Sequence, residues 1–283
     1  MTDKPTPRLS ASSWSLHRSL GAPGIYGPGA DIPRESHGRG AISLLEAPAL
    51  LAGLGIRTME ICHFHLPSRA PDYLNRLRDA LETHGVELWS VLVDAGDLTH
   101  EAHGRRDEAW IADWLDDAQR LGTKRVRVIA GKGAPTEANL ARSRAALLRL
   151  AGAAEARGLR LMTENWFDLL STPAAVHALM DGLDGRIGLC LDFGNWRGAT
   201  KYDDLRAIAG YAESCHAKPQ FDAHGAIERE DFARCVRITR ATGFSGPYTL
   251  IYDGPNPDER AGLAALIEAL TEAWATAGSA LEL

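Results

Sequence analysis

The sequence lacks the features by which several broad classes of protein are recognised. Its four cysteines show no CxxC spacing, and a chain of 283 residues does not need disulfides to bury a core, so we expect no disulfide framework. No stretch approaches the roughly 18 uninterrupted apolar residues of a membrane helix. Residues 1–13 carry no apolar segment of the kind that a signal peptide needs. We therefore expect a cytoplasmic protein with no membrane partner.

Positive charge is also in short supply. The chain has 31 Lys and Arg residues against 37 Asp and Glu residues, which gives a net charge of −6. Nucleic acids and anionic membranes are usually held by basic surfaces, so we expect neither as a partner. Neither GxGxxG nor GxxxxGK[ST] occurs, which argues against the phosphate-binding loop that often follows the first strand of an open, doubly wound sheet.

Short aliphatic runs alternate with longer amphipathic stretches along the whole chain. Eight runs are typical of strands, and they end near Ser13, Cys62, Val93, Ala130, Thr163, Leu191, Ala217 and Tyr252. Residues 72–84, 138–157 and 260–277 have apolar positions at spacings of three and four, which is typical of helices packed on one face. This alternation predicts parallel strands with helical crossovers and fits a closed (β/α)8 TIM barrel better than an open doubly wound sheet.

The composition offers no linker at which the chain would divide. We therefore predict one barrel domain over residues 1–283, with a short flexible N-terminus at residues 1–8. Residues 21–40 are rich in glycine and proline and follow the first strand, so we interpret them as a long loop and a candidate lid.

Three successive strands end in residues that bind metal ions. Glu164 closes the fifth strand, Asp192 closes the sixth, and His216 lies in the seventh. In a TIM barrel the chemistry lies at the carboxyl ends of the strands, so these side chains should meet. Two carboxylates and an imidazole suit Mn²⁺, Mg²⁺, Co²⁺ or Zn²⁺. Each residue alone would more often be a helix cap, an ion-pair partner or a core residue; together they predict a site for one divalent ion.

The residues around these three positions carry a family resemblance. Thr163-Glu164-Asn165, the segment 191–195 (LDFGN), His216-Ala217-Lys218 and the segment 246–254 (GPYTLIYDG) occur in the order found in xylose isomerase-like TIM barrels. The segment 55–61 (GIRTMEI) resembles the second strand of that superfamily, which contains isomerases and epimerases of sugars and sugar phosphates, inosose dehydratases and endonuclease IV. The resemblance implies one divalent ion held by Glu, Asp, His and a second Glu, with the two Glu residues exchanging protons next to a carbonyl.

The sequence departs from that family pattern at two positions. Ile251 stands where the second Glu should be, and an isoleucine neither binds a metal nor takes a proton. Asp253, two residues further on, should point to the same side of the strand and is our candidate for a second catalytic group beside Glu164. Asn195 stands where many sugar epimerases of the family have a His, and its amide can bind a hydroxyl group but does not titrate near neutral pH.

Further side chains should line the mouth of the barrel and contact a polyhydroxylated substrate. We expect substrate contacts from Trp14, His63, Asp94, Lys132, Asn195 and Lys218. An aromatic face against the C–H surface of a sugar could come from Trp14, Trp166 or Trp196. Charges in the middle of barrel strands must find partners inside, so Glu60 and Arg127 are predicted to form an internal ion pair.

These features favour a divalent-metal-dependent enzyme that acts on a sugar or polyol. The reaction would be an isomerisation, epimerisation or elimination through an enediolate, with Glu164 as the base. The alternative is a non-catalytic or metal-free barrel that binds a sugar or regulates a partner. An abasic-site nuclease fits poorly with the acidic balance of the chain. No Arg or Lys cluster is built for a phosphate, so we expect an unphosphorylated substrate; a homo-oligomer remains open.

Overall fold

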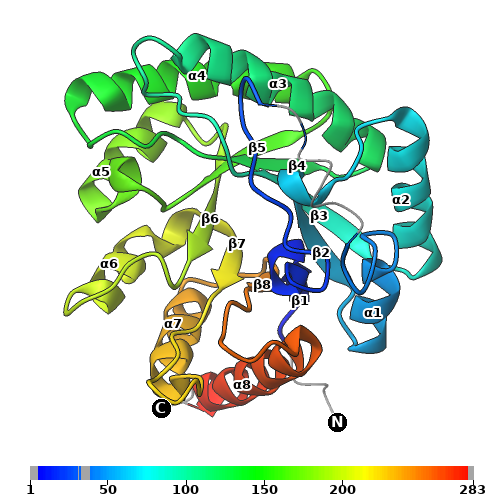
Figure 1. Ribbon diagram of the computed structural model, residues 1–283. Helices are drawn as coiled ribbons and strands as arrows, with labels where there is room; N and C mark the ends of the chain where they lie inside the picture. Colours follow the sequence, from blue (N-terminus) through cyan, green and yellow to red (C-terminus); the bar gives the residue numbers. More distant parts are fainter. Residues whose placement is uncertain (1–5, 31, 33–38, 280–283) are drawn as a thin grey trace.

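A computed structural model of the protein describes residues 6–30, 32 and 39–279. Its eight parallel strands form a closed barrel in the order of the sequence, and the helices form an outer ring around them (Figure 1). The strands are β1 (Leu9–Ser12), β2 (Thr58–Cys62), β3 (Glu87–Val93), β4 (Arg125–Val128), β5 (Arg160–Glu164), β6 (Gly188–Asp192), β7 (Ala212–Ala217) and β8 (Tyr248–Leu250). The (β/α)8 prediction is therefore confirmed, and every predicted strand end lies within two residues of the observed one.

Eight α-helices follow the strands in turn. They are α1 (Ala47–Gly53), α2 (Pro71–Thr83), α3 (Gly104–Leu121), α4 (Glu137–Glu155), α5 (Pro173–Met180), α6 (Lys201–Ile208), α7 (Arg229–Ala241) and α8 (Glu259–Ser279). Short 3-10 turns follow three of the strands, at η1 (Ser13–Leu16), η2 (His63–His65) and η3 (Asp168–Leu170). Two more follow helices α5 and α6, at η4 (Asp181–Leu183) and η5 (Ala209–Tyr211). None of the described helices is both long enough and apolar enough to cross a bilayer.

Local sequence signals explain where the helices begin and end. The Thr136 side chain accepts a hydrogen bond from the backbone N–H of Asn139 and caps α4, and Thr172 does the same for α5 through Ala175. Gly122 ends α3 in the left-handed conformation, with φ of 80°, which costs glycine little because it has no Cβ.

The core lies between the barrel and its helices. Tyr248 of β8 shows how the layers are joined: its ring packs against Trp274 of α8, and its hydroxyl lies 2.8 Å from the Thr239 hydroxyl of α7. The four cysteines are buried and free. Burial of this continuous apolar layer holds the barrel rigid, and the strand ends that it fixes carry the candidate site.

The register of the strands sets the heights of the candidate ligands. Asp192 of β6 pairs directly with His216 of β7, while Glu164 of β5 pairs with Cys190, two residues before Asp192. All of these residues are buried. Alternate residues of a strand point to the same side, so Cys190 and Asp192 both face the barrel interior.

Candidate active site

A cavity of about 160 Å³ opens at the carboxyl ends of the strands. Seven strands contribute a lining residue, and Ile251 contributes another directly after β8. The residues that line the cavity are Ser12, Trp14, Ile25, Cys62, Phe64, Leu92, Asp94, Arg127, Glu164, Trp166, Asp192, Asn195, His216, Lys218 and Ile251. This is the position at which TIM barrels carry their chemistry.

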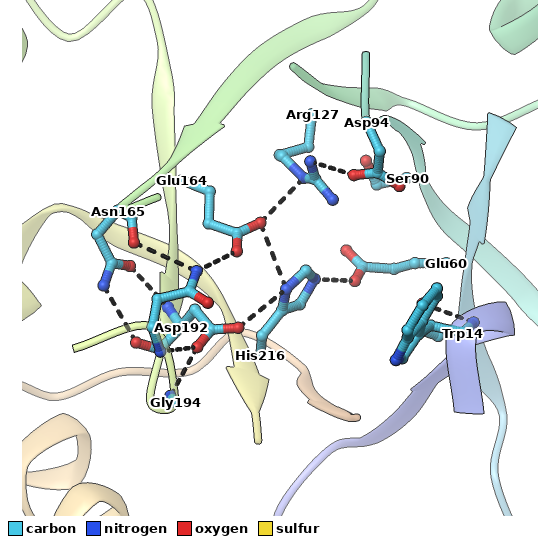
Figure 2. Close-up of polar contacts among 12 residues, drawn as sticks. Trp14, Glu60, Ser90, Asp94, Arg127, Glu164, Asn165, Asp192, Gly194 and His216 are labelled. Carbon is cyan, nitrogen blue, oxygen red and sulfur yellow. Dashed lines mark hydrogen bonds and ion pairs between the residues drawn. The ribbon is translucent and has the colours of Figure 1, made fainter. Parts of the chain in front are cut away.

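The three predicted metal ligands meet in this cavity. His216 Nδ1 lies 3.4 Å from Glu164 Oε2 and 3.6 Å from Asp192 Oδ2, and all three side chains are at least nine-tenths buried. Figure 2 shows the two carboxylates and the imidazole directed toward one another. His216 Nδ1 thus lies near one oxygen of each carboxylate, whereas the three residues whose ligand atoms all lie within 4.8 Å of one another are Glu164, Cys190 and His216.

The second nitrogen of His216 is held by Glu60. His216 Nε2 lies 2.9 Å from Oε2 of that buried carboxylate on β2 (Figure 2). With Nε2 donating its proton to Glu60, loss of the proton on Nδ1 would leave a lone pair directed at Glu164 and Asp192. Ligating histidines typically donate their other N–H to a carboxylate in this way.

Arg127 has a different partner from the one that the sequence suggested. Its Nη1 lies 2.6 Å from Asp94 Oδ1, and its Nε lies 3.1 Å from Glu164 Oε2. The predicted Glu60–Arg127 pair is therefore wrong, because Glu60 instead meets His216. Although burial opposes the charged form, Asp94 and Glu164 raise the pKa of Arg127, so a permanent positive charge lies inside the site.

Asp192 is fixed by the loop that follows it. Its Oδ1 accepts hydrogen bonds from the backbone N–H groups of Gly194 and Asn195, at 2.6 and 2.7 Å, which leaves Oδ2 facing His216. Asn165 holds the backbone of Asp192, with its Oδ1 accepting from the N–H and its Nδ2 donating to the carbonyl oxygen. The LDFGN segment thus positions one carboxylate oxygen toward the cavity.

Glu164 is oriented by three neighbours. Asn195 Nδ2 donates to Oε1 at 2.8 Å, and Oε2 faces Arg127 and His216. Burial alone would raise the pKa of this carboxyl group, but the charges of Arg127 and His216, with hydrogen bonds from His216 and Asn195, lower it to about 2. Glu164 is therefore ionised and available as a ligand at neutral pH.

Cys190 lies beneath these groups and was not among the residues suggested by the sequence. Its Sγ and one ligand atom each of Glu164 and His216 lie within 4.8 Å of one another. Burial raises the pKa of its thiol. Because Cys190 shares a strand face with Asp192, the alternation of β6 could have indicated its position.

The two distances from His216 Nδ1 to the carboxylates are close to those expected around a divalent ion. Ligand atoms bonded to one ion at about 2.1 Å lie roughly 3.0–3.4 Å apart, close to the separations of His216 Nδ1 from Glu164 and Asp192. A hydrocarbon side chain, Ile251, lines the cavity where the family pattern has a fourth ligand. An ion would then have three protein ligands and positions open to water or substrate oxygens.

The predicted substrate contacts divide into two groups. Trp14, Asp94, Asn195 and Lys218 all line the cavity. Of the other tryptophans, Trp166 also lines it, whereas Trp196 is buried and donates its indole N–H to the Leu170 carbonyl oxygen.

His63 and Lys132 do not line the cavity. Both ring nitrogens of the fully buried His63 are bonded to backbone: Nε2 donates to the Tyr26 carbonyl oxygen at 2.8 Å, and Nδ1 accepts from the Asp94 N–H at 3.1 Å. Lys132 is exposed, with its Nζ 5.2 Å from the Phe167 ring. β4 ends at Val128, and the loop has turned outward by residue 132.

Asp253 also lies outside the cavity lining. Its Oδ2 lies 2.9 Å from Lys218 Nζ, and its side chain is about one-third exposed. The expectation that Asp253 shares the face of Ile251 assumed that the strand continued, but β8 ends at Leu250. Asp253 therefore meets Lys218 at the rim of the barrel.

Part of the candidate lid reaches the site. Ile25, within residues 21–40, lines the cavity and is 57% exposed. Residues 31 and 33–38 of the lid, and residues 1–5 of the predicted flexible N-terminus, lie outside the described residues.

The fold and the sequence resemble known proteins. The family model for xylose isomerase-like TIM barrels matches residues 48–273, whereas no curated protein matches the chain. L-ribulose 3-epimerase has a similar structure, with 20% identity, a TM-score of 0.73, and coverage of 98% of this chain and 97% of that one. D-allulose 3-epimerase from Methylomonas sp., in complex with D-allulose, has 16% identity, a TM-score of 0.67, and coverage of 95% and 98%.

A third similar structure contains a metal ion. It is a xylose isomerase-like TIM barrel protein from Mycobacterium smegmatis in complex with magnesium, with 17% identity, a TM-score of 0.69, and coverage of 96% of this chain and 97% of that one. At these identities the structural matches establish a shared barrel fold.

Proposed function

Because this chain belongs to the xylose isomerase-like TIM barrel family, we propose that it is a divalent-metal-dependent enzyme that acts on a sugar or polyol. The observation that carries the proposal is the convergence of Glu164, Asp192 and His216 in the barrel mouth, with the His216 ring held by Glu60. The reaction class is isomerisation, epimerisation or elimination next to a carbonyl. The sugar epimerases among the similar structures support this class.

Glu164, Asp192 and His216 would hold the ion. A bound divalent ion would polarise the carbonyl and hydroxyl oxygens of the substrate and stabilise an enediolate. Glu164 is the residue that takes and returns the proton, and Asn195 and Arg127 fix its two oxygens. Ile251 cannot accept a proton from the opposite side, so a mechanism in which one base acts on a single face is favoured over two-base epimerisation.

The charges of the cavity favour an unphosphorylated substrate. Its two cationic side chains among the described residues are already paired, Arg127 with Asp94 and Glu164, and Lys218 with Asp253. A phosphate would have to compete with these carboxylates. Hydroxyl groups could instead exchange hydrogen bonds with Asn195, Asp94 and Lys218 without breaking an ion pair.

Metal binding is the first test. Tag-free protein would be treated with EDTA, and the melting temperature and the binding heat would be measured with Mn²⁺, Mg²⁺, Co²⁺ and Zn²⁺. We expect at least one ion to bind and raise the melting temperature, because an ion that binds only the folded state stabilises it. Glu164→Gln and His216→Gln should abolish the effect, whereas Glu87→Gln, at an exposed position at the start of β3, should not.

Proton transfer is the second test. Metal-loaded protein would be incubated in D2O with a panel of ketoses, aldoses and cyclic polyol ketones, and deuterium incorporation next to the carbonyl would be followed by NMR. Wild-type protein should exchange one proton of its substrate, and Glu164→Gln should slow the exchange by about 10²–10⁴-fold. If the protein binds no ion and exchanges no proton, the metal-free, sugar-binding alternative is supported. Two features of the site favour that alternative: Ile251 supplies no ligand, and the Arg127 guanidinium already occupies an oxygen of Glu164.

A further inference from the structure

The cavity has two chemically different sides. Strands β3 to β7 and the residues directly after them supply all of its charged lining residues and its histidine: Asp94, Arg127, Glu164, Asp192, His216 and Lys218. Leu92, Trp166 and Asn195 line the cavity on this side as well. The other side, which we call the apolar arc, consists of Ser12, Trp14, Ile25, Cys62, Phe64 and Ile251. β1 pairs with both β2 and β8, so the arc is continuous around the barrel.

The weakly polar groups of the apolar arc are already engaged. The Ser12 hydroxyl oxygen accepts a hydrogen bond from the Trp14 N–H at 3.1 Å and lies 3.7 Å from the Cys62 sulfur. Ile251 removes the one carboxylate that the family pattern would place there. In Figure 2, Trp14 lies on the far side of Glu60 and His216 from the carboxylates of Glu164 and Asp192.

The aromatic residues of the arc are fixed in position. The Trp14 ring stacks on His17 with centroids 4.6 Å apart and an interplanar angle of 21°, and it makes an edge contact with Phe64 at 6.1 Å. A rigid indole is a suitable platform for an apolar ligand surface, because little side-chain entropy is lost when the ligand binds.

Ile25 extends the apolar surface outward. Among the described residues it is the one large hydrophobic side chain that is mostly exposed, and it lines the cavity. The cavity of about 160 Å³ is smaller than the roughly 300–1,000 Å³ of typical ligand sites, so a longer ligand would continue past the mouth and cover Ile25.

From this division we propose that the substrate is a sugar or polyol carrying an aromatic substituent. The hydroxylated part binds among the charged residues of β3 to β7, and the aromatic ring lies on the apolar arc between Trp14, Ile251 and Ile25. This inference rests on the proposed function for the identity of the hydroxylated part. The apolar arc itself supplies the specificity for the substituent.

Matched ligand pairs test the inference. Phenyl and methyl β-glycosides of the same hexose would be compared for a set of hexoses, with dissociation constants measured by calorimetry on Mn²⁺-loaded and EDTA-treated protein. We expect at least one phenyl glycoside to bind about tenfold or more tightly than its methyl partner, because the ring buries apolar surface that the methyl group does not. Equal affinities within each pair, or no binding of any phenyl glycoside, would overturn the inference.

Ile25 offers a variant that should not disturb the fold, because its side chain is largely exposed. Ile25→Ser should reduce the phenyl-to-methyl affinity ratio several-fold, whereas Ile25→Leu should retain the ratio. An unchanged ratio in Ile25→Ser would show that the ring does not lie on this arc.

The two proposals fail in different ways. A phenyl preference in a protein that binds no metal and exchanges no substrate proton would contradict the proposed function alone. Proton exchange with free sugars and no phenyl preference would contradict this inference alone.

Discussion

His216 of β7 and Glu60 of β2 meet across the inside of the barrel, with Nε2 of the imidazole 2.9 Å from Oε2 of the carboxylate. Both side chains are at least nine-tenths buried. The contact fixes the plane of the ring and, with the proton on Nε2, directs Nδ1 toward Glu164 and Asp192 (Figure 2). A residue from the opposite side of the barrel thus orients a candidate metal ligand.

We therefore expect Glu60→Gln to weaken metal binding without removing a ligand. Glutamine has the shape of glutamate and can accept one hydrogen bond from His216. It lacks the negative charge that makes the imidazole of His216 a stronger ligand for the metal ion. Loss of such a carboxylate typically lowers metal affinity about 10–100-fold. Mn²⁺ titration calorimetry measures the effect. Glu87→Gln, which removes an exposed carboxylate from β3, serves as the control, and equal affinities for the two variants would contradict the role assigned to Glu60.

Metal affinity should also rise with pH. Burial opposes the charged imidazole, but Cys190, Glu164 and the hydrogen bond to Asp192 outweigh it and raise the pKa of His216 well above its usual value. An ion must displace the proton on Nδ1, so below that raised pKa each ion bound releases about one proton. Affinity therefore increases with pH until His216 titrates in the metal-free protein. Glu164, with a pKa of about 2, remains ionised throughout this range.

Calorimetry in buffers of different ionisation enthalpy counts the protons released. A binding constant that does not change between mildly acidic and alkaline pH, with no proton release, would mean that His216 is not a ligand.

Arg127 should be important for stability. Its guanidinium is paired with Asp94 and Glu164, and all three side chains are at least nine-tenths buried. Arg127→Met leaves two buried carboxylates without their partner, and removal of one member of a buried ion pair costs about 3–5 kcal/mol. Urea denaturation of EDTA-treated protein measures the loss. Arg186→Met removes an exposed pair with Glu155 and should cost at most about 1 kcal/mol. Similar losses in the two variants would argue against a stabilising role for the buried cation.

The sequence predicted the barrel because each strand–helix unit carries its own signals. Short aliphatic runs alternate with longer amphipathic stretches, and glycines such as Gly122 end helices. These are local properties of the sequence, and they do not depend on contacts with distant residues. The meeting of Glu164, Asp192 and His216 could be predicted for a related reason: the carboxyl ends of all parallel strands lie at one face of the barrel, whatever the packing details.

Contacts across the barrel could not be predicted in this way. Glu60 and Arg127 were rightly expected to need internal partners, but which side chains meet depends on the closure and stagger of the sheet, which brings β2 opposite β7. Asp253 was misplaced because strand alternation was extended beyond the end of β8 at Leu250. His63 was expected to contact the substrate, but both of its ring nitrogens are bonded to backbone groups. Those partners, Tyr26 and Asp94, come from a distant loop and a neighbouring strand end, so the sequence did not indicate them.

Ile251 gives the sharpest test of how this site differs from the family pattern. It lines the cavity directly after β8, where a fourth ligand would lie, and is 6% exposed. Ile251→Glu places a carboxylate on the side of the site opposite Glu164, and an added charged ligand should strengthen divalent-ion binding by roughly tenfold or more. The same change introduces charge into the apolar arc, so the preference for phenyl over methyl glycosides should fall.

Ile251→Gln is the control, because glutamine has the shape of glutamate without its charge. It should lower the phenyl preference but strengthen metal binding much less. If Ile251→Glu binds Mn²⁺ no more tightly than wild type, the ion does not lie between β5 and β8, and the assignment of Glu164 as a ligand is wrong.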